Sequence, residues 1–407
     1  MNCRHCGESL THTFLDLGHA PPSNAYLSAT DLSRPETYYP LKIMVCEHCW
    51  LVQTADYAKA DALFNSEYAY FSSTSSSWLA HAARYAAQVT EQFALGPNSL
   101  VIEVASNDGY LLKNFLVNGI PCLGIEPTAS TAQAAEQLGI PVLREFFGET
   151  LGQQLAARGQ QADLIAGNNV FAHVPDINDF TRGLKGALKQ DGVITLEFPH
   201  LMRLLEFAQF DTVYHEHFSY LSLYTVNRIF AAAGLRVWHV EELASHGGSL
   251  RVYGCHAGAS RANQPTVAAI LMEEAHRGLQ ALNTYQGFQA RANALKDELL
   301  SFLIEQKQLG KTVAAYGAAA KGNTLLNYAG IKPDLLLFVC DAAASKQGKF
   351  LPGSHIPIFE PAALSLHRPD CVLILPWNIA DEVMAQLAHL RVSGTRFVTA
   401  VPWLQII

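Results

Sequence analysis

Residues 99–119 read SLVIEVASNDGYLLKNFLVNG, a strand–turn–helix unit that sets the architecture of the middle of the chain. The apolar run at 99–105 has the length of a buried strand. The turn SNDG follows, and LLKNFLVNG at 111–119 has the pattern of a helix ending at a glycine. A strand, a turn of small residues and a helix open Rossmann-like α/β units, so we expect this fold here.

Further apolar runs on both sides of this unit extend the α/β pattern. Strands separated by helices predict a parallel, doubly wound sheet. The central strands are expected at 121–127, 162–169 and 192–199, and a second α/β unit begins at TVAAYGAAAKGNTLLNYAG (312–330) and continues through 335–341 and 371–377. Between the two units, residues 262–309 have a long helical pattern. We therefore predict four regions: a small N-terminal domain at 1–57, a central α/β domain at 58–258, a helical linker at 259–310 and a C-terminal Rossmann-like domain at 311–407.

Composition narrows the class of protein. The 407 residues are 49% hydrophobic and 16% charged, which predicts a well-packed globular protein. The net charge of −8, without a basic cluster, argues against a nucleic-acid partner. The start MNCRHCGESL does not have the apolar stretch of a signal peptide, and no window is apolar enough for a membrane helix. We expect a cytoplasmic protein, monomeric or homodimeric, without a membrane partner.

Four of the eight cysteines form two CxxC pairs, CRHC and CEHC, through Cys3, Cys6, Cys46 and Cys49. Each pair offers two sulfurs to a tetrahedral ion, so together they predict a structural zinc site. His5 and His48 lie inside the pairs and are alternative ligands. The remaining cysteines stand singly in apolar surroundings and are interpreted as buried small residues: Cys122, Cys255, Cys340 and Cys371.

The turn in EVASNDG (103–109) has the features of a cofactor loop. Glu103 lies in the strand, the small residues 105–107 form the bend, and Gly109 begins the helix. Glu126 ends the next strand, where a carboxylate can accept hydrogen bonds from ribose hydroxyls. The dinucleotide pattern GxGxxG is absent, and the glycine-poor loop fits S-adenosylmethionine (SAM) better. We expect SAM contacts from Glu103, Ala105, Ser106, Asn107, Gly109 and Glu126, the alternative being an ordinary strand–helix turn.

Proton-handling side chains crowd into YHEHFSY at 214–220. Imidazole titrates near neutral pH and is the usual side chain for moving protons. A metal cluster and a polar surface turn are the alternatives for such a segment. The four cysteines already account for a metal site, which favours proton abstraction here.

Several strings spread over the whole chain have the same order as in a known family. They are the CxxC pairs, YFSSTSSSW, EVASNDGYLL, GIEPT, NNVFAHV, YHEHFSYLS, GGSLRVY and GAAAKGNTLLNY. On these motifs the chain resembles the SAM-dependent nucleotide-sugar C-methyltransferase family, which includes the sugar C-3 methyltransferase of the tetronitrose pathway. The resemblance implies that residues 58–258 form the SAM-dependent methyltransferase domain and that the C-terminal domain at 311–407 binds the sugar nucleotide. It also implies methylation at C3 of a dTDP- or GDP-linked 4-keto-6-deoxysugar.

The resemblance also implies roles for individual residues. His217 would be the general base, with Tyr214 and Glu216 beside it and His173 near the substrate. Asn168 and Asn169 would contact the cofactor. Substrate contacts are expected from Tyr68, Tyr70, Lys321, Asn323, Lys346 and His355. Ala343 and Ala344 stand where the family usually has Asn-Pro, which leaves the sugar nucleotide open.

Removing a proton next to a ketone requires more than a base, because imidazole is far weaker than the enolate it must form. The developing oxyanion therefore needs donors, for which Tyr214, His173 or His215 are available. His215 alternatively has only a structural role. Two other functions stay open from the sequence: SAM-dependent O- or N-methylation of a small metabolite, and a noncatalytic zinc-nucleated scaffold.

Overall fold

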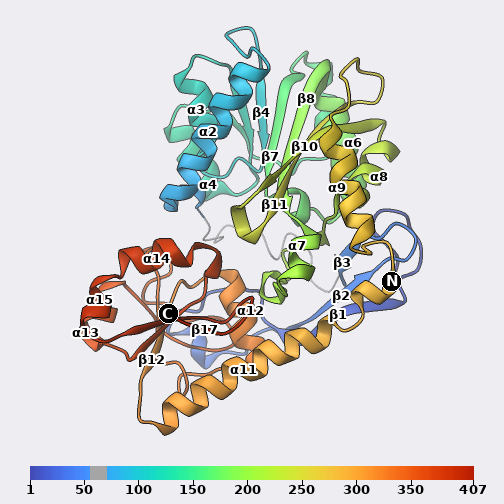
Figure 1. Ribbon diagram of the computed structural model, residues 1–407. Helices are drawn as coiled ribbons and strands as arrows, with labels where there is room; N and C mark the ends of the chain where they lie inside the picture. The colour runs from blue at the N-terminus through green and yellow to red at the C-terminus, as the bar shows by residue number, and fades with distance from the viewer. Residues whose placement is uncertain (56–70) are drawn as a thin grey trace.

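The computed structural model describes residues 1–55 and 71–407, which form three sheets (Figure 1). The predicted α/β fold class is confirmed by this arrangement of a small N-terminal sheet and two larger sheets flanked by helices. In the described part, no helix combines the length and apolar character that crossing a membrane requires.

The N-terminal sheet is antiparallel and has the strand order β1-β2-β3-β9. Three of its strands come from the first 55 residues, namely β1 (His12–Ala20), β2 (Tyr39–Val45) and β3 (Val52–Thr54). The fourth, β9 (Ser219–Tyr220), belongs to the YHEHFSY segment and pairs with β3. The N-terminal domain therefore holds part of the segment that the sequence singled out for proton transfer.

The central sheet has seven strands in the order β10-β11-β8-β7-β4-β5-β6. The strands β4 to β8 are parallel, whereas β11 is antiparallel to both neighbours. Alternate residues of β4 face opposite sides, since Ile102 and Val104 join one core cluster and Val101 joins another. The bounds are β4 (Val101–Val104), β5 (Cys122–Ile125), β6 (Val142–Leu143), β7 (Ala162–Asn168), β8 (Leu188–Pro199), β10 (Leu235–Leu243) and β11 (Ser249–His256).

Helices cover both faces of the central sheet, as a doubly wound unit requires (Figure 1). Ser75 caps α2 by accepting a hydrogen bond from the Trp78 amide, so the serine-rich stretch ends where the helix begins. The helices are α2 (Ser76–Gln92), α3 (Leu112–Val117), α4 (Ala129–Gln137), α5 (Glu149–Ala157), α6 (Ile177–Ala187), α7 (Leu201–Glu206) and α8 (Leu223–Ala232).

Three helices make up the segment between the two α/β units: α9 (Pro265–His276), α10 (Leu282–Tyr285) and α11 (Phe288–Gln308). Gly287 precedes α11 with a φ of 85°, a left-handed conformation that suits glycine. The helix α9 packs on β10, whereas α11 packs against β1 and against the first helix of the C-terminal domain. Figure 1 shows α11 running from the N-terminal sheet to that domain.

The C-terminal sheet has six strands in the order β14-β13-β12-β15-β16-β17, parallel except for β17. Its strands are β12 (Val313–Tyr316), β13 (Val339–Cys340), β14 (Ile358–Phe359), β15 (Cys371–Ile374), β16 (Arg396–Thr399) and β17 (Gln405–Ile406). Its helices are α12 (Ala320–Ala329), α13 (Ala362–His367), α14 (Ala380–Gln386) and α15 (His389–Val392).

Helix α12 of the C-terminal domain contacts both the N-terminal domain and the residue that precedes the YHEHFSY segment. The hydroxyl of Thr324 on α12 donates to the carbonyl of Val213 (2.8 Å), and the Asn323 amide donates to the carbonyl of Ser23 (2.6 Å). Both side chains are buried. The C-terminal domain, the N-terminal domain and the YHEHFSY segment are therefore in direct contact.

Candidate active site

Cys3, Cys6, Cys46 and Cys49 bring their sulfur atoms together, with all four within 4.8 Å of one another. The Sγ atoms of Cys3 and Cys49 are 3.5 Å apart, as are those of Cys6 and Cys46. Four thiolates about 2.3 Å from one zinc ion would be separated by about 3.8 Å, so the four sulfurs fit a tetrahedral zinc site. The ring of His5 instead contacts the amide oxygen of Asn178 (2.8 Å), which argues against His5 as a ligand.

The predicted cofactor loop joins β4 to the turn before α3. Ala105, Asn107 and Gly109 have positive φ values of 57°, 49° and 78°. Glu126, at the end of β5, accepts hydrogen bonds from the backbone amides of Asn107 (3.0 Å) and Thr128 (2.9 Å). Its carboxylate therefore fixes the loop. The remaining lone pairs of the Glu126 carboxylate are available to a ribose, and this contact stays a prediction.

Several buried polar atoms in this loop and in the strands beside it have no hydrogen-bond partner among the described residues. They include both carboxylate oxygens of Glu103, the hydroxyl of Ser106 and the amide oxygen of Asn168. Burial raises the pKa of Glu103 well above its usual value. Unsatisfied buried acceptors are costly, and the ammonium and hydroxyl groups of SAM would supply the donors they need. The residues thus fit this cofactor.

Aromatic rings cover the same loop. Trp78, in the first turn of α2, stacks on Tyr110 with ring centroids 5.9 Å apart. Tyr110 in turn accepts a hydrogen bond from the Asn168 amide (3.3 Å). The backbone amides of Ser72 and Ser73 donate to the side chains of Asn107 and Asp108. The segment before α2 is therefore anchored on the loop that would hold SAM.

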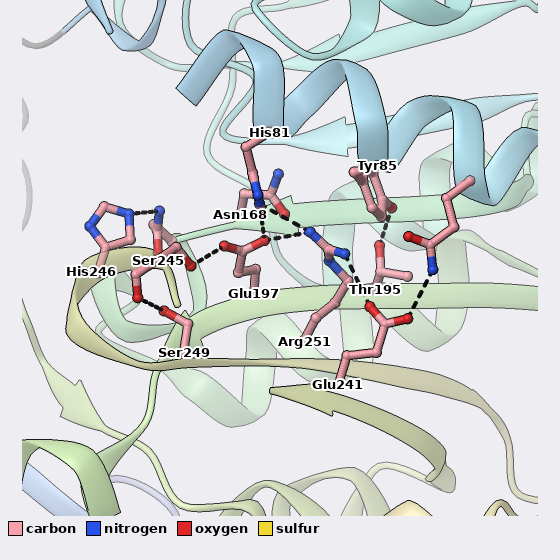
Figure 2. A network of polar contacts seen from close by, with 12 residues as sticks. His81, Tyr85, Asn168, Thr195, Glu197, Glu241, Ser245, His246, Ser249 and Arg251 are labelled. Carbon is pink, nitrogen blue, oxygen red and sulfur yellow. Dashed lines mark hydrogen bonds and ion pairs between the residues drawn. The ribbon is translucent and has the colours of Figure 1, made fainter. Parts of the chain in front are cut away.

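A buried ionic network supports this edge of the sheet (Figure 2). Glu197 on β8 is fully buried and accepts hydrogen bonds from His81 (2.9 Å), Arg251 (2.8 Å) and Ser245 (2.8 Å). Burial alone would raise the pKa of Glu197, but His81 and Arg251 lower it to about 2. The ionised carboxylate thereby ties α2, β11 and the 245–248 loop together.

That loop carries His246, which has a positive φ of 54°. Its Nε2 lies 3.0 Å from the amide nitrogen of Asn169, and Trp78 packs edge-to-face on its ring. The two asparagines predicted at the cofactor are therefore held by aromatic neighbours, Asn168 by Tyr110 and Asn169 by His246.

His217 is buried, and its ring has a defined tautomer. The Nδ1 atom lies 2.8 Å from the carbonyl oxygen of Thr212, which can only accept, so Nδ1 carries the proton. The lone pair is then on Nε2, which has no hydrogen-bond partner among the described residues. Burial, together with the nearby charges of His173, His246 and Lys321, lowers the pKa of His217 well below 6.5. His217 is thus a neutral imidazole with an available acceptor.

The other predicted residues of the segment surround this ring. The ring of Tyr214 lies on His217 with a centroid distance of 3.9 Å, and His173 packs edge-to-face at 4.6 Å. Burial lowers the pKa of His173 to about 4. Glu216 accepts two hydrogen bonds from the side-chain amide of Asn24, at 2.8 and 2.9 Å. His215 instead contacts the backbone carbonyl of Tyr39 (3.3 Å), which gives it a structural role.

Lys321 on α12 reaches the same region from the C-terminal domain. Its Nζ donates to Asn378 (2.6 Å) and lies 4.6 Å from the centre of the Trp377 ring. The Trp377 indole donates to Asp211 (2.7 Å), a fully buried carboxylate just before the YHEHFSY segment. Burial lowers the pKa of Lys321 and raises that of Asp211 to about 6, while each partly offsets the shift of the other.

The remaining predicted substrate residues differ in their surroundings. Asn323 faces the N-terminal domain through Ser23, whereas Lys346 pairs with Asp341 (3.3 Å). His355 pairs with Glu36 of the N-terminal domain (2.9 Å). Tyr68 and Tyr70 lie outside the described residues. Contacts of all five with substrate stay predictions.

Comparisons with known proteins show the family of this chain and the class of its domains. Family profiles match a methyltransferase domain at 78–240, a zinc binding domain at 3–64 and a C-methyltransferase C-terminal domain at 244–402. The C-methyltransferase NovU of Streptomyces niveus is 35% identical over 400 residues, which cover 98% of this chain and 95% of NovU. The chain belongs to the C-methyltransferase family.

The methyltransferase is therefore a SAM-dependent enzyme with a zinc-binding N-terminal domain, as predicted. Among solved structures, the magnesium protoporphyrin IX methyltransferase of Synechocystis PCC 6803 with bound SAH matches 44% of this chain and 82% of its own, at 13% identity and a TM-score of 0.35. A SAM-dependent methyltransferase from Anabaena variabilis matches 44% of this chain and 86% of its own, at 16% identity and the same TM-score of 0.35.

Several residues near the candidate site are not predictable from local sequence patterns. Asp211 and Trp377 come from different domains and are far apart in sequence, so no local spacing relates them. His246 directly precedes the GGSLRVY motif, and this position was the available signal. Arg251 lies inside the same motif, but its pairing with Glu197 depends on the antiparallel register of β11 and β8.

Proposed function

We propose that the enzyme methylates C3 of a nucleoside-diphosphate 4-keto-6-deoxysugar and that His217 removes the C3 proton. The observation that carries this proposal is the fixed tautomer of His217, whose Nδ1 proton is held by the Thr212 carbonyl. A neutral imidazole with its lone pair on Nε2 is what a general base requires. Membership of the C-methyltransferase family supports carbon as the accepting atom.

The proposed base needs help, because a proton next to a ketone is far less acidic than an imidazolium ion. Tyr214 contacts the His217 ring, and its hydroxyl can donate to the oxygen that becomes the enolate. His173 packs on the same ring and is hydrogen-bonded to the Glu216 backbone, so it helps to shape the site. Lys321 brings a buried cation to the same region, where its charge is less screened than in water. These groups would stabilise negative charge on O4 of the sugar.

The electrophile comes from the cofactor: SAM, when bound, supplies a methyl group that a carbanion can attack. The chain's part is to place the substrate between the cofactor loop and His217. His246, which contacts Asn169, and Lys321, anchored through Asn378, both lie close enough to His217 to lower its pKa. In-line placement of the two reacting carbons is the main requirement of such a transfer.

The pH dependence of kcat/KM follows from the state of His217. Its pKa is lowered below 6.5, so the neutral base predominates at and above pH 6.5 and is lost only as pH falls through the lowered value. We expect kcat/KM to be level from pH 6.5 upward and to decline at more acidic pH. A pH–rate series at saturating SAM measures this. A half-maximal point above pH 6.5 would contradict the assignment.

The substrate class is tested by mass spectrometry. Purified enzyme and SAM are incubated with dTDP- and GDP-linked 4-keto-6-deoxysugars, and products are screened for the mass of one added CH2. We expect at least one 4-keto sugar nucleotide to be methylated and the corresponding 4-hydroxy sugar nucleotides to be inert. Methylation of the 4-hydroxy compounds would disprove the enolate route.

A further inference from the structure

The backbone around His217 is held by the N-terminal domain. Strand β9 pairs with β3, with Ser219 opposite Gln53. The Thr54 amide donates to the carbonyl of Phe218 (3.1 Å), and the Thr54 hydroxyl donates to the carbonyl of His217 itself. Residues 217–219 are thus bonded to two consecutive residues of β3.

Strand β3 is in turn bonded to the first zinc knuckle. The side chain of Gln53 is 1% exposed. Its Nε2 donates to the sulfur of Cys3 (3.2 Å), and its Oε1 accepts from the backbone amide of Arg4 (2.9 Å). Residues 3 and 4 therefore form hydrogen bonds with both ends of this buried amide.

Arg4 adds a second connection between the same elements. Its guanidinium donates to the carbonyl of Thr54 (3.0 Å) and lies 5.3 Å from the centre of the Phe218 ring. It also donates to the carbonyl of Pro175 (2.7 Å), just after the turn that holds His173. The first knuckle thereby contacts both histidine-bearing segments of the site.

We infer that Gln53 is a positioning residue that links the zinc site to the catalytic base. A zinc-bound thiolate keeps its negative charge and its position, so it is a fixed acceptor for the Gln53 amide. Gln53 then fixes β3, and β3 fixes the main chain on which the His217 ring is oriented. The inference rests on the proposal that His217 is the base. It assigns the zinc-binding domain a part in catalysis besides folding.

The test is Gln53→Met, which keeps the length of the side chain and removes both hydrogen bonds. At full zinc content, confirmed by elemental analysis, we expect kcat to fall about 10- to 100-fold with KM for SAM unchanged, a typical loss when a partner of a metal ligand is removed. We also expect faster amide hydrogen exchange in peptides covering 214–220, with no change in β7. Gln306→Met is the matched control, because Gln306 is also buried but lies in α11 and contacts Arg396.

A second measurement covers the case in which Gln53→Met does not fold or bind zinc. Zinc is withdrawn from the unmodified full-length enzyme by a chelator and then added back, and exchange at 214–220 is followed throughout. We expect exchange to accelerate on withdrawal and to recover on addition. Unchanged exchange at 214–220 in both experiments would overturn the inference.

Faster exchange in Gln53→Met with unchanged kcat would overturn the inference as well, because the connection would then not act on the base. The exchange measurement does not depend on which residue is the base. Whether His217 removes the proton is decided separately by variants of His217. Failure of the inference can therefore be told apart from failure of the proposed function.

Discussion

His217→Asn is expected to lower kcat by about 10²- to 10⁴-fold, the usual contribution of a general base. The asparagine amide can take the place of Nδ1–H and keep the hydrogen bond to the Thr212 carbonyl, which measures 2.8 Å in the native enzyme. It offers nothing in place of the Nε2 lone pair. The variant therefore removes the base and leaves its anchor, and steady-state kinetics together with SAM binding by calorimetry measure the effect.

His215→Gln is the matched control in the same segment. Its Nε2 can take the place of the native Nε2 and keep the contact with the Tyr39 carbonyl, 3.3 Å away in the native enzyme. We expect little change in kcat. Comparable losses in both variants would show that the segment matters only for folding, and the assignment of His217 as base would then be wrong.

Arg251→Met is expected to reduce the free energy of unfolding by about 3–5 kcal/mol, the usual result of removing one partner of a buried ion pair. The Arg251 side chain is 3% exposed and that of Glu197 is fully buried. Methionine fills much of the space but leaves the Glu197 carboxylate with only His81 and Ser245 (Figure 2). Thermal or urea unfolding measures the loss.

Arg182→Met is the control for this prediction, because Arg182 and Glu149 pair at 2.6 Å on the surface, with 44% and 37% of their side chains exposed. An exposed pair contributes about 0–1 kcal/mol.

The stabilities of the two variants should also depend differently on acid pH. The pKa of Glu197 is lowered to about 2, so its contribution is present above pH 4.5 and is lost as pH falls towards 2. Equal losses for both variants at pH 7 would contradict the role of the network.

Local sequence patterns predicted the parts of the site that are formed by neighbouring residues. The CxxC pairs predict the metal site because two cysteines three residues apart can bind the same ion from one short loop. EVASNDG was recognisable because a buried strand, small residues and a helix follow each other directly. YHEHFSY stood out by composition alone, since apolar packing does not call for such a set of side chains.

The contacts that organise these parts were not predictable, because they are non-local. Strand β9 has only two residues, too few for a periodic signal, and its pairing with β3 joins residues more than 160 positions apart, as the Thr54–His217 bond (separation 163) shows. Gln53 has no sequence feature that distinguishes it from a surface glutamine. Its side chain is buried and bonded to Cys3 and Arg4 of the first knuckle, about 50 residues away in sequence.

We propose that His217 generates an enolate before any methyl group is transferred. The most direct measurement is the loss of deuterium from C3 of a [3-2H] 4-keto-6-deoxysugar nucleotide, incubated with the enzyme in ordinary water without SAM and followed by mass spectrometry. We expect enzyme-dependent wash-out in the native protein and its loss in His217→Asn. Full retention of deuterium by a native enzyme that methylates the same substrate once SAM is added would contradict it, as would undiminished wash-out by His217→Asn.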